Sequence, residues 1–469
     1  MDELIFASAT ELARAIRARE LSCEEVVEAY LDRIEKVNPR LNAVVQLTAS
    51  AARAEAREAD AALARGQIKG PLHGVPMTIK DNMDTAGVIC TSGTKGRTSF
   101  VPRQDGPVVA RMRAAGAILL GKTNLPELGL AFETDNLVYG RTNNPYDLSR
   151  TPGGSSGGEA AIIAAGGSAL GLGNDIGGSV RLPSHFCGIA GLKPTAGRVP
   201  RTDISMFSYS VRDVMLHVGP MAKFVEDLVL TLPIIAGVDW RDPSVVPVPL
   251  GDPKKVDLRS LRAAYHTNNG VVPPTPETAI VVEKTAQALS NEGISIEEKC
   301  PKGIEETMSI WNEILASALD GGSGLKKLFR MIGTTEIHPW VQGTIKFFHG
   351  IAMSTSQFTN LMLNWSRFCV SLLSFMEKHD VLICPVCALP ALPHGGSYDP
   401  ENIPMLAPFS YTMTYNITGW PAVVVRAGTS PEGLPIGVQV VARPWRDDVA
   451  LAVAQQIEAV MGGWQGPPL

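Results

Sequence analysis

A lysine and several serines in this 469-residue chain stand where their side chains could do covalent chemistry. Lys80 follows the aliphatic run from Val75 to Ile79, which predicts a buried strand. A lysine that loses its water at such a strand end is pushed toward the neutral form, and a neutral lysine can act as a general base. Taken alone, however, the strand favours a lysine that reaches solvent or pairs with Asp81.

Glycines crowd around two serine clusters between Gly153 and Pro194. Ordering a glycine costs more backbone entropy than ordering other residues, so such a stretch usually marks unusual backbone geometry or close approach to a ligand. In the second cluster, Gly177 and Gly178 would let successive amides converge on one point, as an oxyanion hole requires. Ser179 is therefore a candidate nucleophile if a base can reach it, and a purely structural turn is the equal alternative.

The segment from Gly116 to Thr123 matches the phosphate-loop pattern G-x-x-x-x-G-K-[ST]. A phosphate loop needs a strand before its first glycine and a flexible turn between the two glycines. Here the residues before Gly116 have a helical pattern and those between the glycines favour a strand, so the order is inverted. We therefore expect no nucleotide binding at this segment.

Two segments also match serine-hydrolase motifs in sequence, but without the structural context that those motifs require. Residues 153–157 fit G-x-S-x-G around Ser155, but a nucleophile elbow needs a strand directly before the serine, and the preceding text is polar turn sequence. Residues 92–95 fit S-x-x-K, without the S-D-N and K-T-G motifs that accompany it in penicillin-recognising enzymes. We expect neither motif to act in that way.

The pattern of histidines and cysteines predicts no metal or cofactor site. His73 and His185 lie near the glycine-rich stretch, but neither has a carboxylate or metal partner at motif spacing, so we expect structural histidines. Cys384 and Cys387 form C-P-V-C after an aliphatic run, and no second cysteine or histidine pair accompanies them. Seven cysteines, an odd number, fit a reducing compartment rather than a disulfide framework.

The composition is that of an ordinary soluble globular protein, with 45% hydrophobic and 19% charged residues. A net charge of −5 offers no electrostatic case for binding nucleic acid or an anionic membrane. The first residues lack the basic and apolar regions of a secretory signal, and no run of about 18 apolar residues could span a bilayer. We therefore expect a cytoplasmic protein with no nucleic-acid or membrane partner.

The elements that must position these side chains begin with two helices, each introduced by a capping box: Ser8 with Glu11, and Ser22 with Glu25. A third, alanine-rich helix is predicted over residues 51–65. Short aliphatic runs then alternate with helical stretches and glycine turns, which indicates an α/β protein around a largely buried sheet. The clearest predicted strands cover residues 75–79, 117–120, 381–383, 422–425 and 437–441.

Residues 303–378 differ from the rest of the chain, because large apolar residues occur there within an otherwise polar sequence whose pattern is helical or irregular. We expect most of this insert to be a helical layer packed on the sheet. Part of it is a candidate roof over an apolar substrate pocket, since binding clefts are mostly apolar with few polar groups. The side chains concerned are Trp311, Leu315, Leu325, Phe329, Trp340, Phe347, Phe348, Phe358, Trp365 and Phe368.

Several long segments together resemble the amidase signature family, serine hydrolases that cleave carbon–nitrogen bonds with a Ser-Ser-Lys triad. The matching text is GVPMTIKDN, GAILLGKTNLPELG, GRTNNPYD, TPGGSSGGEAA and GNDIGGSVRLPSHFCGIAGLKPT. The likeness extends over nearly the whole chain and is strongest from residue 71 to 200. It implies one large α/β/α domain over residues 1–469, with a central mixed, twisted sheet covered by helices on both faces.

The resemblance also assigns roles by position. Lys80 resembles the family's base, Ser155 the bridging serine that follows a cis peptide bond, and Ser179, 24 residues further on, the nucleophile. Ser156 and Asp175 are expected to support these groups from behind. The family's oxyanion hole corresponds to the backbone amides of Ile176, Gly177, Gly178 and Ser179. The implied mechanism uses no histidine, metal or cofactor.

Two departures bear on the site and its substrate. Many family members carry Ser or Thr where this chain has Asn174, which could alter the hydrogen bonds that steady the oxyanion hole. The subunit that makes amidated transfer RNA usually has glutamine where this chain has Leu182, and no partner-subunit signature is present. The sequence around Ser179 is most similar to the branch of the family that hydrolyses fatty-acid amides and aryl acylamides, whose pockets are apolar.

We therefore expect a small-molecule amide, anilide or carbamate substrate with apolar groups, and a monomer or homodimer. Loop residues 204–209, with Met206 and Phe207, are expected to line the pocket together with part of the insert. An esterase would use the same triad, and only its leaving group would differ. The chain could also serve a transamidating enzyme or be a non-catalytic binding protein, although a binding protein has little need of all three triad residues.

Overall fold

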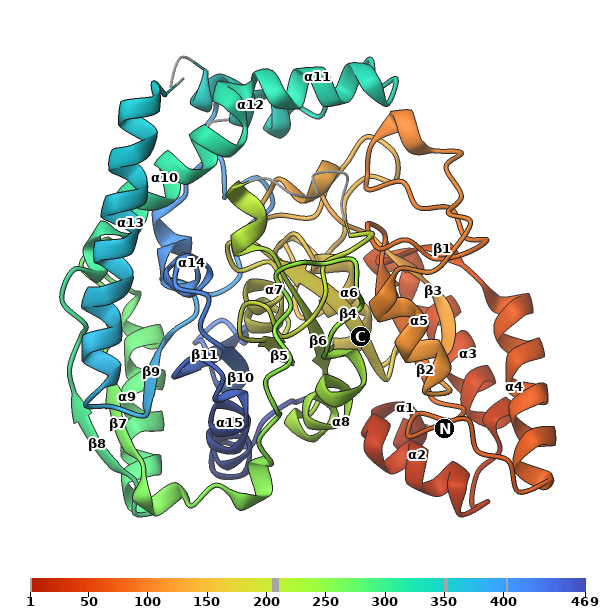
Figure 1. Cartoon of the computed structure of the whole chain (residues 1–469). Coiled ribbons are helices and arrows are strands. Elements are labelled where there is room, and N and C mark those ends of the chain that lie inside the picture. Colours follow the sequence, from red (N-terminus) through yellow and green to blue (C-terminus); the bar gives the residue numbers. More distant parts are fainter. Residues whose placement is uncertain (1, 205–210, 350–352, 402–403) are drawn as a thin grey trace.

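The centre of the molecule is an eleven-stranded sheet with the strand order β1-β3-β2-β4-β6-β5-β10-β11-β9-β7-β8. The computed structural model describes residues 2–204, 211–349, 353–401 and 404–469 (Figure 1). The strands are β1 (Val44–Leu47), β2 (Pro76–Lys80), β3 (Ile118–Thr123), β4 (Leu170–Asp175), β5 (Ala190–Lys193), β6 (His217–Ala222), β7 (Arg262–Tyr265), β8 (Ser295–Glu298), β9 (Val381–Pro385), β10 (Ala422–Thr429) and β11 (Pro435–Ala442).

The helices surround this sheet. They are α1 (Asp2–Phe6), α2 (Ala9–Arg17), α3 (Cys23–Leu41), α4 (Ala49–Ala64), α5 (Pro107–Ala114), α6 (Gly157–Ala164), α7 (Arg181–Phe186), α8 (Val225–Ile235), α9 (Pro276–Asn291), α10 (Thr307–Ala318), α11 (Ser323–Met331), α12 (Pro339–Phe348), α13 (Thr355–Met376), α14 (Ser410–Ile417) and α15 (Asp447–Met461). Both predicted capping boxes are formed, at the starts of α2 and α3. The five predicted strands are also confirmed, as β2, β3, β9, β10 and β11.

The sheet is mixed, as the resemblance implied. β2 runs parallel to both of its neighbours, β3 and β4, whereas β4, β6, β5, β10, β11 and β9 pair antiparallel in succession. Because β2, β3 and β4 run in one direction, their last residues, Lys80, Thr123 and Asp175, meet at one edge of the sheet. Ligand sites in α/β proteins form at such carboxyl ends.

Helices cover both faces of the sheet, and side-chain alternation along the strands shows why. Leu170 and Leu172 of β4 face the largest core, which they share with side chains of α3, α8 and α15. The glycines between and after them, Gly171 and Gly173, face the opposite side, where Glu159 and Ser156 approach the strand backbone. The absence of side chains at these two positions lets the residues around the start of α6 lie directly on the sheet.

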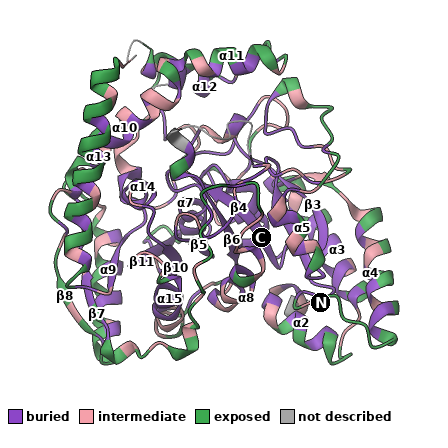
Figure 2. Ribbon diagram, in the orientation of Figure 1, coloured by how far each residue is buried: buried purple, intermediate pink, exposed green. Residues whose placement is uncertain are grey.

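The insert is helical: α10 and α13 lie at the left of the molecule and α11 and α12 along its top in Figure 1. Trp365 and Phe368 of α13 pack in a second core with Phe186 of α7, while Leu325 and Phe329 of α11 pack in a smaller cluster with α12. The outer surface of α13 is exposed (Figure 2). In the described part of the chain, no helix combines the length and apolarity needed to cross a membrane.

Candidate active site

The site begins at Lys80, the last residue of the fully buried strand β2. Its ammonium nitrogen, Nζ, donates hydrogen bonds to Ser155 Oγ at 2.7 Å and to Asn174 Oδ1 at 2.6 Å. The side chain is 0% exposed, so it does not reach solvent. Nor does it pair with Asp81, whose carboxylate accepts hydrogen bonds from the amide and hydroxyl of Thr91.

Burial governs the protonation of Lys80. Loss of hydration lowers the pKa of Lys80 to about 7, and the negative charges of Asp175 and Glu159 oppose the shift only in part. The neutral amine is therefore well populated near pH 7, in contrast to an exposed lysine, whose pKa is about 10.4. A neutral amine beside a serine hydroxyl can accept a proton from it.

Ser155 lies just before α6, and the Gly154–Ser155 peptide bond is cis, as the resemblance implied. The described segment from residue 124 to 156 contains no strand, so the nucleophile-elbow arrangement is absent there. The next residue, Ser156, is buried and joins two parts of the site. Its amide donates to the carbonyl of Ser179 at 3.1 Å, and its hydroxyl donates to the carbonyl of Asn174 at 3.4 Å.

The β4–α7 loop, residues 176–180, carries Ser179 and the four amides predicted for an oxyanion hole. The amide of Gly178 donates to Asp175 Oδ1 at 2.8 Å, so it is already engaged within the protein. Among the residues that the structure describes, the amides of Ile176, Gly177 and Ser179 have no protein acceptor. Within that part of the chain, three of the four amides are therefore free to meet a ligand.

Asp175, the last residue of β4, anchors this loop through its carboxylate. Its carboxylate accepts hydrogen bonds from the amides of Gly178 and Val180 and forms a fully buried ion pair with Arg181 at 2.9 Å. Arg181 and Asn416 hold the pKa of Asp175 well below its usual range, despite the opposing effect of burial. A carboxylate that stays charged and is bonded on both oxygens fixes the backbone around it.

Glu159 forms a second buried acidic group behind the site. It accepts hydrogen bonds from the hydroxyls of Thr123, at 2.6 Å, and Thr78. Burial raises the pKa of Glu159 to about 7, although these hydrogen bonds and the nearby lysines Lys80 and Lys122 favour its charged form. The site thus contains a lysine and a glutamate that both titrate near neutral pH.

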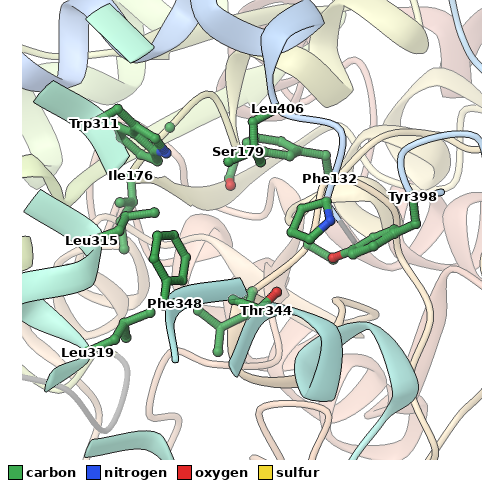
Figure 3. Close-up of a pocket in the computed structure, with 15 residues that line it drawn as sticks. Phe132, Ile176, Ser179, Trp311, Leu315, Leu319, Thr344, Phe348, Tyr398 and Leu406 are labelled. Carbon is green, nitrogen blue, oxygen red and sulfur yellow. The ribbon is translucent and has the colours of Figure 1, made fainter. Parts of the chain in front are cut away.

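An apolar cavity opens beside Ser179 (Figure 3). Trp311, Leu315, Leu319 and Phe348 of the insert stand across the cavity from Phe132, Tyr398 and Leu406, with Ser179 between the two groups in this view. The lining is completed by Gly129, Leu130, Ala131, Ile176, Gly177, Thr344 and Pro404. Such a lining favours apolar ligand groups next to the serine hydroxyl and the free amides.

Not every expected cavity residue could be placed. Met206 and Phe207 lie outside the described residues. Two parts of the wall were not predicted: residues 129–132, which contribute Phe132, and residues 398 and 404–406, which contribute Tyr398 and Leu406. Both lie in loops whose sequence shows no apolar periodicity. Asn174 was expected to act on the hydrogen bonds of the loop, but its side chain contacts the ammonium of Lys80 instead.

The other motifs fold as structural elements. Residues 118–123 form β3, and the lysine of the phosphate-loop match, Lys122, is buried and donates to the carbonyl of Met83 and the hydroxyl of Thr85. His185 accepts from the amide of Gly437 at 2.8 Å, and burial lowers its pKa to about 4. Within the described ranges, no group of three or more His, Cys, Asp or Glu side chains could hold a metal ion.

The comparisons with known proteins agree on one family. The family model Amidase matches residues 25–451. The chain is 34% identical to fatty-acid amide hydrolase 2-A of Danio rerio, covering 99% of this chain and 90% of that protein. It is 33% identical to a glutamyl-tRNA(Gln) amidotransferase subunit of Moorella thermoacetica, covering 97% of each chain. The structure of 6-aminohexanoate cyclic dimer hydrolase with its substrate superposes with a TM-score of 0.87, at 30% identity, over 97% of both chains.

Proposed function

This chain belongs to the amidase family and is a hydrolase of carbon–nitrogen bonds in linear amides; from that premise we propose that Ser179 is its nucleophile, Ser155 the proton relay and Lys80 the base. The observation that carries the proposal is the 2.7 Å hydrogen bond between the buried amine of Lys80 and Ser155 Oγ. The amide of Ser156 donates to the carbonyl of Ser179 at 3.1 Å, so the backbone that carries Ser155 lies against the loop whose Ser179 lines the apolar cavity. A buried base, a relay hydroxyl and an adjacent serine are the parts that nucleophilic catalysis requires.

In the first half of the reaction, the Ser179 hydroxyl oxygen attacks the carbonyl carbon of the amide. As the carbon–oxygen bond forms, the proton of Ser179 passes to Ser155, and the proton of Ser155 passes to the neutral amine of Lys80. The carbonyl electron pair moves onto oxygen, and the free amides of Ile176, Gly177 and Ser179 stabilise the negative charge. Gly178 takes no part, because its amide is bonded to Asp175.

In the second half, the carbonyl re-forms and the carbon–nitrogen bond breaks. Lys80, now an ammonium, returns its proton through Ser155 to the departing nitrogen, which leaves as an amine. An ester between the acyl group and Ser179 remains. Water then attacks this ester by the same relay in reverse, so that the acid is released and Ser179 regains its proton.

The apolar lining of the cavity supports an acyl or aryl group of low polarity, in an amide, anilide or carbamate. Phe132, Trp311 and Phe348 would contact such a group directly beside Ser179. The likeness to fatty-acid amide hydrolase 2-A favours this substrate class. A preference for esters is the main alternative for the substrate, because an ester would use the same nucleophile and relay. A second alternative is a transamidating role, which the likeness to the amidotransferase favours.

A panel of matched substrates tests the proposal. We expect 4-nitroanilides with butanoyl to decanoyl chains to be hydrolysed with a kcat/KM that rises with chain length, and glutamine to release no ammonia. Intact-mass spectrometry after treatment with a fluorophosphonate should show one label, located on Ser179 by peptide mapping. Turnover of 4-nitrophenyl esters without any turnover of the matching anilides would favour the esterase, and rapid glutamine hydrolysis would favour the transamidating role.

The pH dependence follows from the pKa of Lys80. The reaction needs the neutral amine, and a lowered pKa means that this form is lost as the pH falls below about 7. We expect kcat/KM for an anilide to rise with pH through about 7 and then to level off. A steady rise up to about pH 10 would indicate a lysine with an ordinary pKa and would count against the assignment of Lys80.

A further inference from the structure

Helix α14 holds the β4–α7 loop in place, although more than two hundred residues separate the two in sequence. The hydroxyl of Thr412 donates to the carbonyl of Gly177 at 2.6 Å. One turn further along the helix, Asn416 Nδ2 donates to the carbonyl of Asp175 at 3.2 Å and to its carboxylate at 2.9 Å. Both side chains are buried, so water does not compete for these bonds.

The peptide unit between Gly177 and Gly178 is therefore held at both ends. Its carbonyl accepts from Thr412, and its amide donates to Asp175 at 2.8 Å. A peptide unit is planar, so fixing both ends sets the orientation of the whole plane. The amides of Gly177 and Ser179 flank this plane, and they are two of the three amides in the loop without an acceptor in the described chain.

Side chains also enclose the loop from two directions. A Cβ atom built on Gly177 would lie 2.6 Å from Cη2 of the Trp311 ring, and one built on Gly178 would collide with the hydroxyl of Thr412. Gly178 has a φ of +126°, a conformation that side-chain-bearing residues rarely adopt. The two glycines therefore allow Trp311 of α10 and Thr412 of α14 to touch the backbone of the loop.

We propose that Thr412 is a positioning residue for amide hydrolysis: its hydroxyl orients the Gly177–Gly178 peptide so that the amides of Gly177 and Ser179 point at the carbonyl oxygen of the substrate. The inference rests on the proposed role of these amides as the oxyanion hole. An oxyanion hole works because its donors are aimed in advance, so a small rotation of the peptide weakens binding of the transition state more than binding of the substrate.

The hydroxyl of Thr412 has a second neighbour, the carbonyl of Phe409 at 2.9 Å. A hydroxyl has one proton to donate, and the carbonyl of Gly177 is the closer acceptor. Removing the hydroxyl would nevertheless remove both contacts. A control is therefore needed that alters a buried threonine of the same helix without altering the loop.

Thr414 provides that control. It is fully buried in α14, and its hydroxyl bonds to the hydroxyl of Thr307 at 2.8 Å and to the carbonyl of Ser410 at 3.4 Å. Neither partner belongs to the β4–α7 loop. Thr414→Val and Thr412→Val thus remove the same chemical group from the same helix, and only the second removes a contact to Gly177.

We expect Thr412→Val to lower kcat for an anilide about 10- to 100-fold, somewhat less than the loss of a whole oxyanion-hole donor, while KM changes less than about threefold. Thr412→Ser, which keeps the hydroxyl, should restore most of the activity. The Ki of a trifluoromethyl ketone with the same acyl chain, which forms an oxyanion on the nucleophile, should rise in parallel with the loss of kcat. Thr414→Val should retain the kcat and Ki of the wild type at a comparable loss of thermal stability.

The inference is overturned if Thr412→Val keeps the wild-type kcat, or if Thr414→Val loses as much. Should Thr412→Val not fold, the same comparison is made with Thr412→Ala against Thr414→Ala. Failure of the proposed function is distinguishable, because the wild type itself would then hydrolyse no anilide and take no fluorophosphonate label. A wild type that does both, together with an unaffected Thr412→Val, removes only the role of Thr412.

Discussion

Ser179→Ala is expected to lower kcat/KM for any amide substrate by about 10⁴-fold or more, because the acyl-enzyme can no longer form. Anilide hydrolysis would be followed by release of 4-nitroaniline, and acylation by intact-mass spectrometry after a rapid acid quench. The variant should show neither a burst of amine nor an acyl adduct. Since Ser179 is 7% exposed and alanine fits the same space, the thermal stability should stay close to that of the wild type.

Ser184 offers a matched control for this variant. It is a fully buried serine on α7, five residues beyond Ser179, and its hydroxyl donates only to the carbonyl of Val180 at 2.8 Å among the contacts of the described chain. Ser184→Ala should keep kcat/KM within about threefold of the wild type, because it loses one bond inside a helical turn. If Ser179→Ala still formed an acyl adduct, another residue would be the nucleophile.

Lys80→Ala should reduce kcat/KM by about 10³- to 10⁴-fold, the upper part of the range for loss of a general base. The hydroxyl of Ser155 then has no group to accept its proton. Alanine leaves a space the length of the lysine side chain, so added propylamine should restore part of the activity in proportion to its free-base concentration. Such rescue separates the loss of a base from a change in structure.

Lys122 provides the comparison for Lys80. It is also a fully buried lysine in the neighbouring strand β3, but its ammonium bonds to the carbonyl of Met83 and the hydroxyl of Thr85, away from Ser155. Lys122→Met should lower the free energy of unfolding, measured in urea, yet keep kcat/KM within about tenfold of the wild type. Near-normal activity in Lys80→Ala would show that the proton goes elsewhere.

The elements that carry the chemistry could be predicted because their signals are local. The aliphatic run before Lys80 sets a strand, and that strand lies between two parallel neighbours, so its end falls at the ligand-binding edge. The glycines on both sides of Ser155 and those just before Ser179 likewise mark turns in the sequence itself. Patterns of this kind need only a few adjacent residues.

The contacts that complete the site depend on distant residues, and no local pattern reports them. That the amide of Gly178 is taken up by Asp175 depends on how the loop folds back over the strand end. The hydrogen bond from Thr412 to Gly177 joins residues that are 235 positions apart in the sequence. Phe132 and Tyr398 reach the cavity from segments whose sequences show no apolar periodicity. These features follow from tertiary packing, which the periodicity of one segment does not contain.

The origin of the cavity walls has a consequence for engineering. The proposed base, relay serine and nucleophile lie at the end of β2, before α6 and in the β4–α7 loop, whereas most of the wall comes from the insert and from residues 129–132, 398 and 404–406. A mutant library confined to Leu315, Leu319 and Leu406 would therefore vary the size and shape of the accepted acyl group while leaving the reacting atoms untouched. Selectivity and turnover can then be evolved as two nearly independent traits.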